Sequence, residues 1–228
     1  TMKVLSMTSI RQCEAAVESL SDYSRTVRLG LRIALRHRPR EGRVLPTTAT
    51  GRQGAIVFGS AWGMCGRFNE NLAEHATERL GEAQRPRTVL VLGEYVGDAL
   101  AAQGLAPDRQ AAGPESVEGI TARVQELLVT IEQWRMDEQI DRVLLFYNQS
   151  TSGAGYNPTT QRLLPLDNEW LAQLEREDWP TRMVPTFRGD WEALFASLVR
   201  QYFFVSLYRA CAESLASEHA SRLAAMQM

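Results

Sequence analysis

The glycine-rich turn Gly59-Ser-Ala-Trp-Gly-Met-Cys-Gly66 is the segment of this chain whose composition best fits a chemical task. It follows a short apolar run over 54–59 and precedes a helical pattern over 68–80. A glycine-rich turn that leads into a helix N-terminus can cradle a phosphate group. However, the turn lacks the Gly-Lys-Ser/Thr of a Walker A loop and the GxGxxG spacing of a dinucleotide site. The pattern therefore gives nucleotide binding only weak support.

Cys65 and His75 have the residue types of a nucleophile and its base. A nucleophile elbow needs glycine two residues before and two residues after the nucleophile. Here Gly63 fits this requirement and Arg67 does not, which disfavours cysteine catalysis. No group of His, Cys, Asp or Glu has the spacing of metal ligands, and we expect neither a metal nor a cofactor.

The end of the first helical segment carries a run of basic residues: Arg25, Arg28, Arg32, Arg36, Arg38, Arg40 and Arg43. Such a run is typical of a solvated helix face, or of a face that contacts an acidic or lipid-headgroup surface. The formal net charge of −2 gives no reason to expect a nucleic-acid partner. No apolar run approaches the roughly 18 residues of a membrane-spanning helix, and no signal peptide is visible. The odd number of cysteines, without CxxC spacing, fits a reduced cytosolic protein.

Two long helices are predicted at the ends of the chain, over 1–36 and 191–228. The first has apolar residues at three- and four-residue steps, and the second contains neither Gly nor Pro. Neither helical pattern has a cap or stop signal at the chain end, so we expect both helices to extend further in a longer natural chain.

Between these helices, apolar strands alternate with helices, which is typical of a parallel sheet covered on both faces. The expected strands are 54–59, 88–93 and 142–147, and the expected helices are 68–80, 95–103 and 115–133. Residues 161–166 are expected to form an edge strand because Pro165 cannot donate to a central ladder. Residues 167–190 are expected to be irregular.

The predicted fold is an α/β, Rossmann-like domain (37–190) inserted between two terminal helices (1–36 and 191–228) that pair as an antiparallel coiled coil. Small residues at four-residue spacing in the last helix allow another helix to approach closely. The expected pairing face consists of Ala212, Ala216, Ala220, Ala224, Leu215 and Cys13. Cys13 and Cys211 are interpreted as small buried apolar side chains.

Four blocks of the sequence together resemble the gamma subunit of rotary ATP synthases. The turn 59–69 resembles that family's "TDRGLCGGLN" segment, and 158–166 resembles its "PTxxxLLPL" strand. The helix 213–226 (ESLASEHASRLAAM) resembles "ENLASEQAARMAAM", and 1–7 resembles the "KAMKMV" start of its first helix. The order and spacing of the blocks agree over essentially the whole chain.

This resemblance implies a central-stalk rotor subunit that carries torque between a membrane c-ring and the alpha/beta catalytic hexamer, with no bond chemistry of its own. It implies alpha, beta, epsilon and c-ring partners at the cytoplasmic face of the bacterial inner membrane, without a transmembrane segment. Met2, Lys3 and Arg222 are candidate contacts to the hexamer. Candidate contacts to the c-ring are Phe187, Arg188, Arg36 and Arg38. The alternative is a doubly wound α/β ligand-binding protein or enzyme with a ligand at the strand C-termini.

The chain departs from the family pattern at two places. The Asp-Arg of the family's turn is replaced by Ala61-Trp62, and a following glycine by Arg67. Before the last helix, an aromatic-Glu-Pro segment is replaced by Phe187-Arg188-Gly189, which reverses a charge. These departures predict a divergent gamma subunit of the alternative bacterial type, and they leave open whether the coupling ion is H⁺ or Na⁺, because that ion is set in the membrane ring.

Overall fold

The computed structural model describes residues 2–39, 51–81, 87–151, 155–180 and 182–227. Its helices are α1 (Met2–Arg36), α2 (Phe68–Gly81), α3 (Tyr95–Ala102), α4 (Val117–Asp137), α5 (Asn168–Arg176) and α6 (Trp191–Ala225). Its strands are β1 (Arg52–Phe58), β2 (Arg87–Leu92), β3 (Arg109–Ala111), β4 (Ile140–Ser150) and β5 (Tyr156–Leu164). Among the described residues, no helix combines the length and the apolar character needed to cross a membrane.

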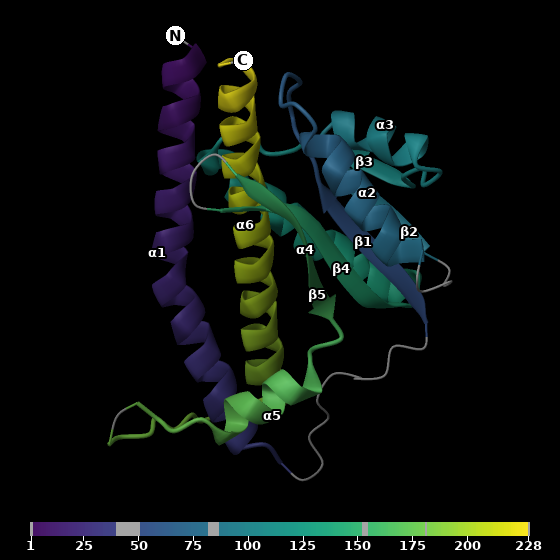
Figure 1. Ribbon diagram of the computed structural model, residues 1–228. Helices are drawn as coiled ribbons and strands as arrows, with labels where there is room; N and C mark the ends of the chain where they lie inside the picture. Colours follow the sequence, from purple (N-terminus) through teal and green to yellow (C-terminus); the bar gives the residue numbers. More distant parts are fainter. Residues whose placement is uncertain (1, 40–50, 82–86, 152–154, 181, 228) are drawn as a thin grey trace.

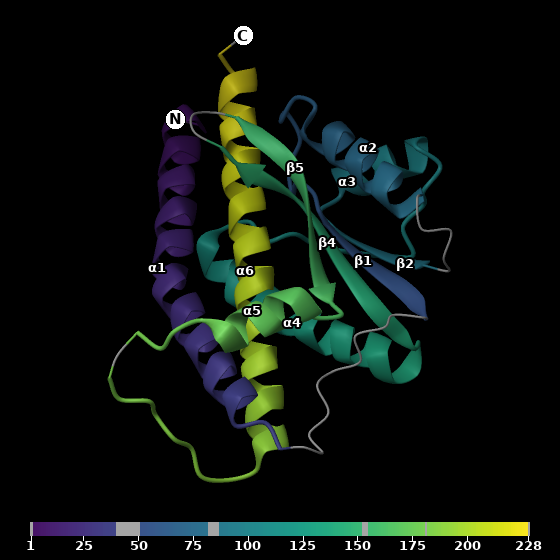
Figure 2. The same ribbon diagram turned by 60° about the horizontal axis from the view of Figure 1, so that its bottom comes forward.

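The two long helices pair in antiparallel fashion, as the sequence predicts, and both ends of the chain lie at the same end of the molecule (Figures 1 and 2). Each helix has 35 residues. Trp191 donates from its indole nitrogen to the carbonyl of Ala34 at 2.6 Å. Gly30 allows the helices to lie close together at this point, because a Cβ there would lie 2.7 Å from a methyl group of Leu198.

The alanines of α6 are largely buried, although they do not form a straight stripe. Ala212, Ala216 and Ala220 are 0%, 3% and 6% exposed, whereas Ala224 is half-buried. Four residues exceed one helical turn of 3.6 residues, so the stripe winds about 40° around the helix at each step. α6 packs against α1, α4 and β4. Alanines that point in successively different directions can therefore all be covered by a neighbouring element. Leu215 and Cys13 are also buried, and the assignment of all six residues to the pairing face stays a prediction.

Replacing Ala216 by tryptophan is expected to destabilise the helix pair. Ala216 is 3% exposed, and inserting a large side chain into a well-packed site typically costs about 1–3 kcal/mol. Urea denaturation of the variant measures this loss. The matched control is Ala225→Trp in the same helix, because Ala225 is exposed. Equal stability of both variants and the wild type would argue against close packing around Ala216.

The sheet has the strand order β3-β2-β1-β4-β5. The first four strands in this order are parallel, whereas β5 pairs antiparallel with β4 and forms an edge. The parallel pairing predicted for the strands at 54–59, 88–93 and 142–147 is therefore confirmed, and the predicted edge strand runs antiparallel to its neighbour. Pro158 lies within β5, a position that is tolerated at an edge because only one side of the strand needs partners.

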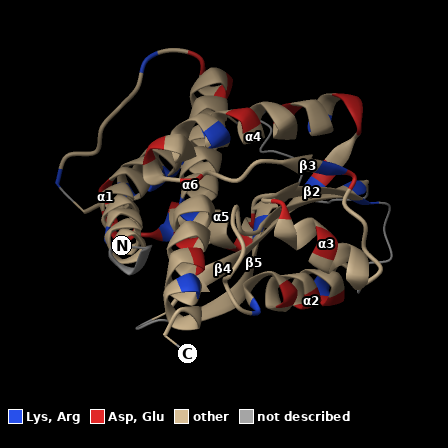
Figure 3. Ribbon diagram, turned by 90° about the horizontal axis from the view of Figure 1, so that it is seen from above, with Lys and Arg blue, Asp and Glu red and all other residues tan. Residues whose placement is uncertain are grey.

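Alternate residues of the strands face two separate helix layers. Ala55 and Val57 of β1 pack with α2 and α3, whereas Ile56 and Phe58 pack with α4, α6 and α1. Seen end on, the sheet lies between α4 and the α2–α3 layer (Figure 3). The helix pair therefore lies on one face of the sheet, next to α4.

Two elements differ from the expectation for the second half of the chain. The edge strand covers Tyr156–Leu164 and ends before Pro165, whereas 161–166 was expected. Residues 168–176, expected to be irregular, form α5. The cause is an N-cap, because the Asp167 carboxylate accepts from the amides of Glu169 at 2.9 Å and Trp170 at 3.5 Å. The buried Leu171 and Leu174 then hold this short helix against the core.

Candidate functional site

Three serines on one face of α6 join the helix to the α/β domain. Ser214 donates to the carbonyl of Phe58 at 2.7 Å, and Ser217 donates to the carbonyl of Asn148 at 3.0 Å. Ser221 donates to the carbonyl of Cys65 at 2.6 Å. Spacings of three and four residues place these hydroxyls on the same side of the helix. They bond to the ends of β1 and β4 and to the turn after β1, so one helix face fixes several parts of the domain.

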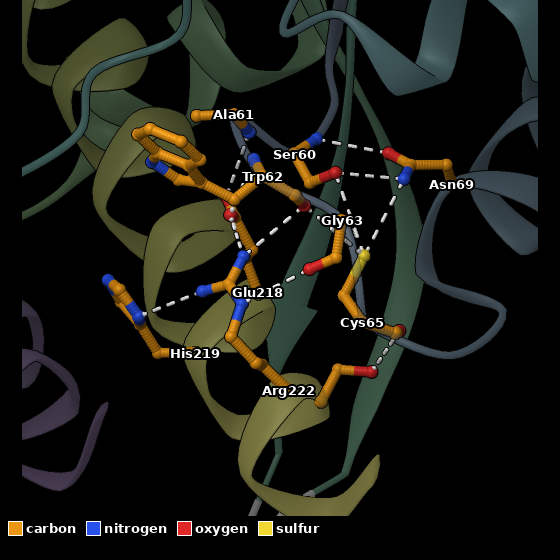
Figure 4. Close-up of polar contacts among 10 residues, drawn as sticks. Ser60, Ala61, Trp62, Gly63, Cys65, Asn69, Glu218, His219 and Arg222 are labelled. Atoms are coloured by element: carbon orange, nitrogen blue, oxygen red, sulfur yellow. Dashed lines mark hydrogen bonds and ion pairs between the residues drawn. The ribbon is translucent and has the colours of Figure 1, made fainter. Parts of the chain in front are cut away.

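A buried ion pair lies at the centre of this contact (Figure 4). Glu218 and Arg222 are 2% and 6% exposed, and Nη2 of Arg222 lies 2.5 Å from Oε1 of Glu218. The carboxylate of Glu218 also accepts from the backbone amides of Ala61 and Trp62, each at 3.3 Å. We call Glu218, Arg222 and the turn 59–66 the turn clamp.

Arg222 completes the turn clamp from the other side. Its Nε donates to the carbonyl of Gly63, and its Nη2 donates to the carbonyl of Trp62, each at 3.3 Å. The turn therefore offers both amides and carbonyls to the pair, and both buried charges are hydrogen-bonded. Burial raises the pKa of Glu218, and the hydrogen bond and charge of Arg222 act against that rise.

The turn itself is held by a small polar cluster. Asn69 at the start of α2 accepts from the amide of Ser60 at 3.0 Å and donates to the hydroxyl of Ser60 at 2.9 Å. Cys65 lies 3.6 Å from both the Ser60 hydroxyl and the Asn69 amide nitrogen. Met64 has a φ of 58°, a left-handed conformation that non-glycine residues adopt only at a cost. This network fixes the shape of the turn, and its tip residues Trp62 and Met64 stay 58% and 69% exposed.

The anion bound by the backbone amides of the turn is a carboxylate of the same chain. Glu218 accepts from the amides of Ala61 and Trp62, which are backbone donors of the kind a phosphate would need. Nucleotide binding at this turn would have to displace a carboxylate that also pairs with Arg222. The geometry thus supports a structural role for the turn.

Cys65 and His75 do not meet as a nucleophile and a base. His75 shares a hydrogen bond of 2.7 Å with the hydroxyl of Thr160 on β5, and Cys65 lies with Ser60 and Asn69. Burial raises the pKa of the Cys65 thiol, which disfavours the thiolate. Cys13 and Cys211 are buried as predicted, and burial raises the pKa of each to about 12. Within the described residues, no cluster of His, Cys, Asp or Glu could hold a metal ion.

His219 adds a pH-dependent element beside the turn clamp. Its Nδ1 lies 3.3 Å from Nη1 of Arg222. Burial, and then the charge of Arg222, lower the pKa of His219 from its ordinary 6.5 to about 4. The unfolded chain therefore takes up this proton near pH 6.5, and the folded chain takes it up only near pH 4. Within that window, acid favours the unfolded state.

We expect His219→Gln to flatten the pH dependence of stability. Between pH 7 and pH 4.5, the free energy of unfolding should fall further in the wild type than in the variant. The raised pKa of Glu218 acts in the opposite direction, since protonation favours the folded state there, but it is present in both proteins. Urea titrations at the two pH values measure the difference. Parallel pH profiles for the two proteins would refute the role of His219.

The candidate ring contacts lie at the end of the molecule opposite the two termini, and some of them have partners within the chain. Arg36 donates to the carbonyls of Glu175 and Glu177 at 3.3 and 2.7 Å. Phe187 is half-buried and meets His37 edge to face, with ring centroids 5.9 Å apart. Arg38 and Arg188 are exposed. Arg40 and Arg43 of the basic run lie outside the described residues.

The candidate hexamer contacts differ in what the structure says of them. The backbone of Met2 and Lys3 is helical, and their side chains lie outside the described part of the chain. Arg222 is 6% exposed and bonded within the turn clamp, which leaves little of its side chain for another subunit. The pairing of Glu218 with the turn is not among the contacts predicted from the sequence. The available signal was a Glu-Arg pair at i, i+4 within a serine- and alanine-rich helix face.

Comparison with known proteins identifies similar chains. A family model described as ATP synthase matches residues 1–228. The ATP synthase gamma chain of Pelotomaculum thermopropionicum is 27% identical over 228 residues, covering 99% of this chain and 78% of that protein. The gamma chain of Granulibacter bethesdensis is 26% identical over 238 residues, covering 99% of this chain and 79% of that protein.

Among solved structures, the central stalk and c-ring of the Tetrahymena thermophila mitochondrial ATP synthase contains a chain of similar fold. The TM-score is 0.66 at 18% identity, and the match covers 99% of this chain and 96% of that chain. A rotor chain of the Euglena gracilis mitochondrial enzyme matches with a TM-score of 0.50 at 17% identity, over 96% of this chain and 90% of that chain. At these identities, the likeness bears on the fold.

Proposed function

This chain belongs to the ATP synthase family as a gamma chain, and from that premise we propose that it is the central-stalk rotor subunit of a rotary ATP synthase. It carries torque between a membrane c-ring and the alpha/beta catalytic hexamer. Ring rotation thereby drives ATP synthesis, and ATP hydrolysis drives ion transport in reverse.

One observation carries this proposal: a long antiparallel helix pair is joined to the side of an α/β domain by a buried polar contact. A rotor needs a shaft that resists bending and a joint that does not slip under load. The α1–α6 pair supplies the shaft. The three serines of α6 and the turn clamp supply the joint, because each hydrogen bond there has a fixed direction.

We further propose that the chain itself performs no bond chemistry. Its contribution is asymmetry, since a helix pair with a domain on one side presents a different face to each catalytic subunit around it. Each catalytic site would then be biased by contacts that differ between rotor orientations. The turn amides bound to Glu218 and the separation of Cys65 from His75 support this assignment.

The proposed partners are the alpha and beta subunits, an epsilon subunit and the c-ring, with the chain peripheral to the cytoplasmic face of a bacterial inner membrane. Met2 and Lys3 lie at the end that would enter the hexamer. Phe187, Arg188 and Arg38 lie at the opposite end, which would face the ring. We assign Arg36 and Arg222 to contacts within the chain, on the hydrogen bonds described above.

Co-purification from the host tests this proposal. A tag on the natural gene product should recover alpha, beta and epsilon subunits in a complex that hydrolyses ATP. Recovery of the chain alone, under conditions that keep the host's ATPase intact, would contradict the assignment. A ligand screen of the α/β domain would then be the next step.

A further inference from the structure

A polar pocket of about 390 Å³ lies between α1 and the segment that follows α5. On the α1 side it is lined by Ser21, Ser24, Arg25, Arg28 and Arg32. On the other side lie the carboxylates of Glu177 and Asp178. We call this the arginine pocket. Its α1 residues come from 21–32, and the ribbon shows α5 beside that half of α1 (Figure 2).

Arg32 is the unusual residue of the arginine pocket. It is 3% exposed, yet the residues that the structure describes give its guanidinium only distant partners. Its Nη1 lies 3.8 Å from the Glu177 carboxylate, and its Cζ lies 5.6 Å from the ring centre of Trp179. Within the described part of the chain, its Nε and Nη2 have no hydrogen-bond partner. Buried N–H groups of a permanent charge strongly favour an acceptor.

The acid opposite Arg32 is already engaged by a second arginine. Nη2 of Arg28 lies 2.5 Å from Oε1 of Glu177, so one carboxylate serves two guanidinium groups. Arg25 adds a third positive charge, against the two carboxylates of Glu177 and Asp178. The arginine pocket therefore has an excess of positive charge and unused donors.

From this geometry we propose that the arginine pocket binds a phosphate-class oxyanion. Arginine binds phosphate oxygens through parallel N–H donors, and the hydroxyls of Ser21 and Ser24 add neutral donors on the same helix face. The phosphate can belong to a lipid headgroup or to a free phosphate, and the two sources are separable by experiment. The anion site does not depend on the proposed rotor function. Only the lipid source is connected with the rotor function, because that function places the chain beside a membrane.

The first arm of the test uses inorganic phosphate and the purified chain. Titration calorimetry in chloride buffer of matched ionic strength should give saturable binding. Arg25→Gln should weaken it by at least about tenfold, the effect expected from losing a charge-assisted contact. Arg25 is exposed and lies on the helix surface, so this variant should fold normally. Arg32→Gln should also weaken binding. Arg11→Gln is the matched control, as an exposed arginine of the same helix outside the pocket.

The second arm uses sedimentation with vesicles of phosphatidylcholine, with or without phosphatidic acid. Binding to the acidic vesicles that falls in Arg25→Gln and persists in Arg11→Gln would assign the phosphate to a lipid. Binding of inorganic phosphate with the same pattern, but no vesicle binding, would assign it to a free anion. Absence of binding in both arms, or equal losses in Arg25→Gln and Arg11→Gln, would overturn the proposal.

Discussion

Replacing Glu218 by alanine is expected to lower the free energy of unfolding by about 3–5 kcal/mol, the range for removing one partner of a buried ion pair. The change leaves Arg222 charged and 6% exposed. It also removes the acceptor of the Ala61 and Trp62 amides. Urea denaturation monitored by far-UV circular dichroism measures the loss.

An ion pair on the protein surface provides the matched control for Glu218→Ala. Arg123 and Glu126 form an i, i+3 pair on α4, and the side chain of Glu126 is 62% exposed. Removing an exposed partner of this kind typically costs no more than about 1 kcal/mol. Glu218→Gln should be milder than Glu218→Ala, since its amide oxygen can still accept from the turn. If Glu218→Ala costs no more than Glu126→Ala, the turn clamp does not hold the domain on α6.

Replacing Gly93 by alanine is expected to destabilise the fold by about 3 kcal/mol, through a clash and a strained backbone together. Gly93 follows β2 with a φ of +98°, and a Cβ there would lie 2.3 Å from the carbonyl oxygen of Ser60. Because that oxygen belongs to the backbone of the turn, it cannot move without disturbing the turn clamp. The same urea denaturation assay applies.

Gly104→Ala separates the two causes of the Gly93 effect. Gly104 has a φ of +79°, and apart from its chain neighbours no heavy atom of the described residues lies within 4 Å of its added Cβ. It should therefore carry only the backbone cost of about 1–2 kcal/mol. Equal losses in Gly93→Ala and Gly104→Ala would show that close packing of Gly93 against the turn contributes nothing.

The long elements follow from the sequence because their patterns are local and repeated. The end helices have many turns of helical periodicity, and β1 and β4 carry apolar runs that only a covered sheet can bury. The short elements contain too few residues for a repeated pattern to be recognised in the sequence. β3 has three residues with exposed or half-buried side chains, and α5 depends on one capping residue, Asp167. The direction of β5 depends on pairing with β4, which no local pattern records.

The contacts of the turn clamp and of the arginine pocket could be predicted only in part, for a related reason. The glycine-rich turn gives only weak support for an anion at its amides, and Glu218, which lies 157 residues beyond Ala61, reaches the turn only through the docking of α6. Likewise, the spacing of the arginines in α1 predicts a common face. Their partner Glu177 lies just after α5, in a segment without periodicity. Tertiary packing selects these partners.

Direct observation of rotation would show whether this chain is a rotor. Met136 on α4 is 83% exposed, and the native cysteines are buried, so Met136→Cys offers one site for attaching a gold particle. The complex with the alpha and beta subunits of the host would be fixed to a surface through those subunits. We expect unidirectional, ATP-dependent rotation of the particle. A particle that stays still while the complex hydrolyses ATP would contradict it.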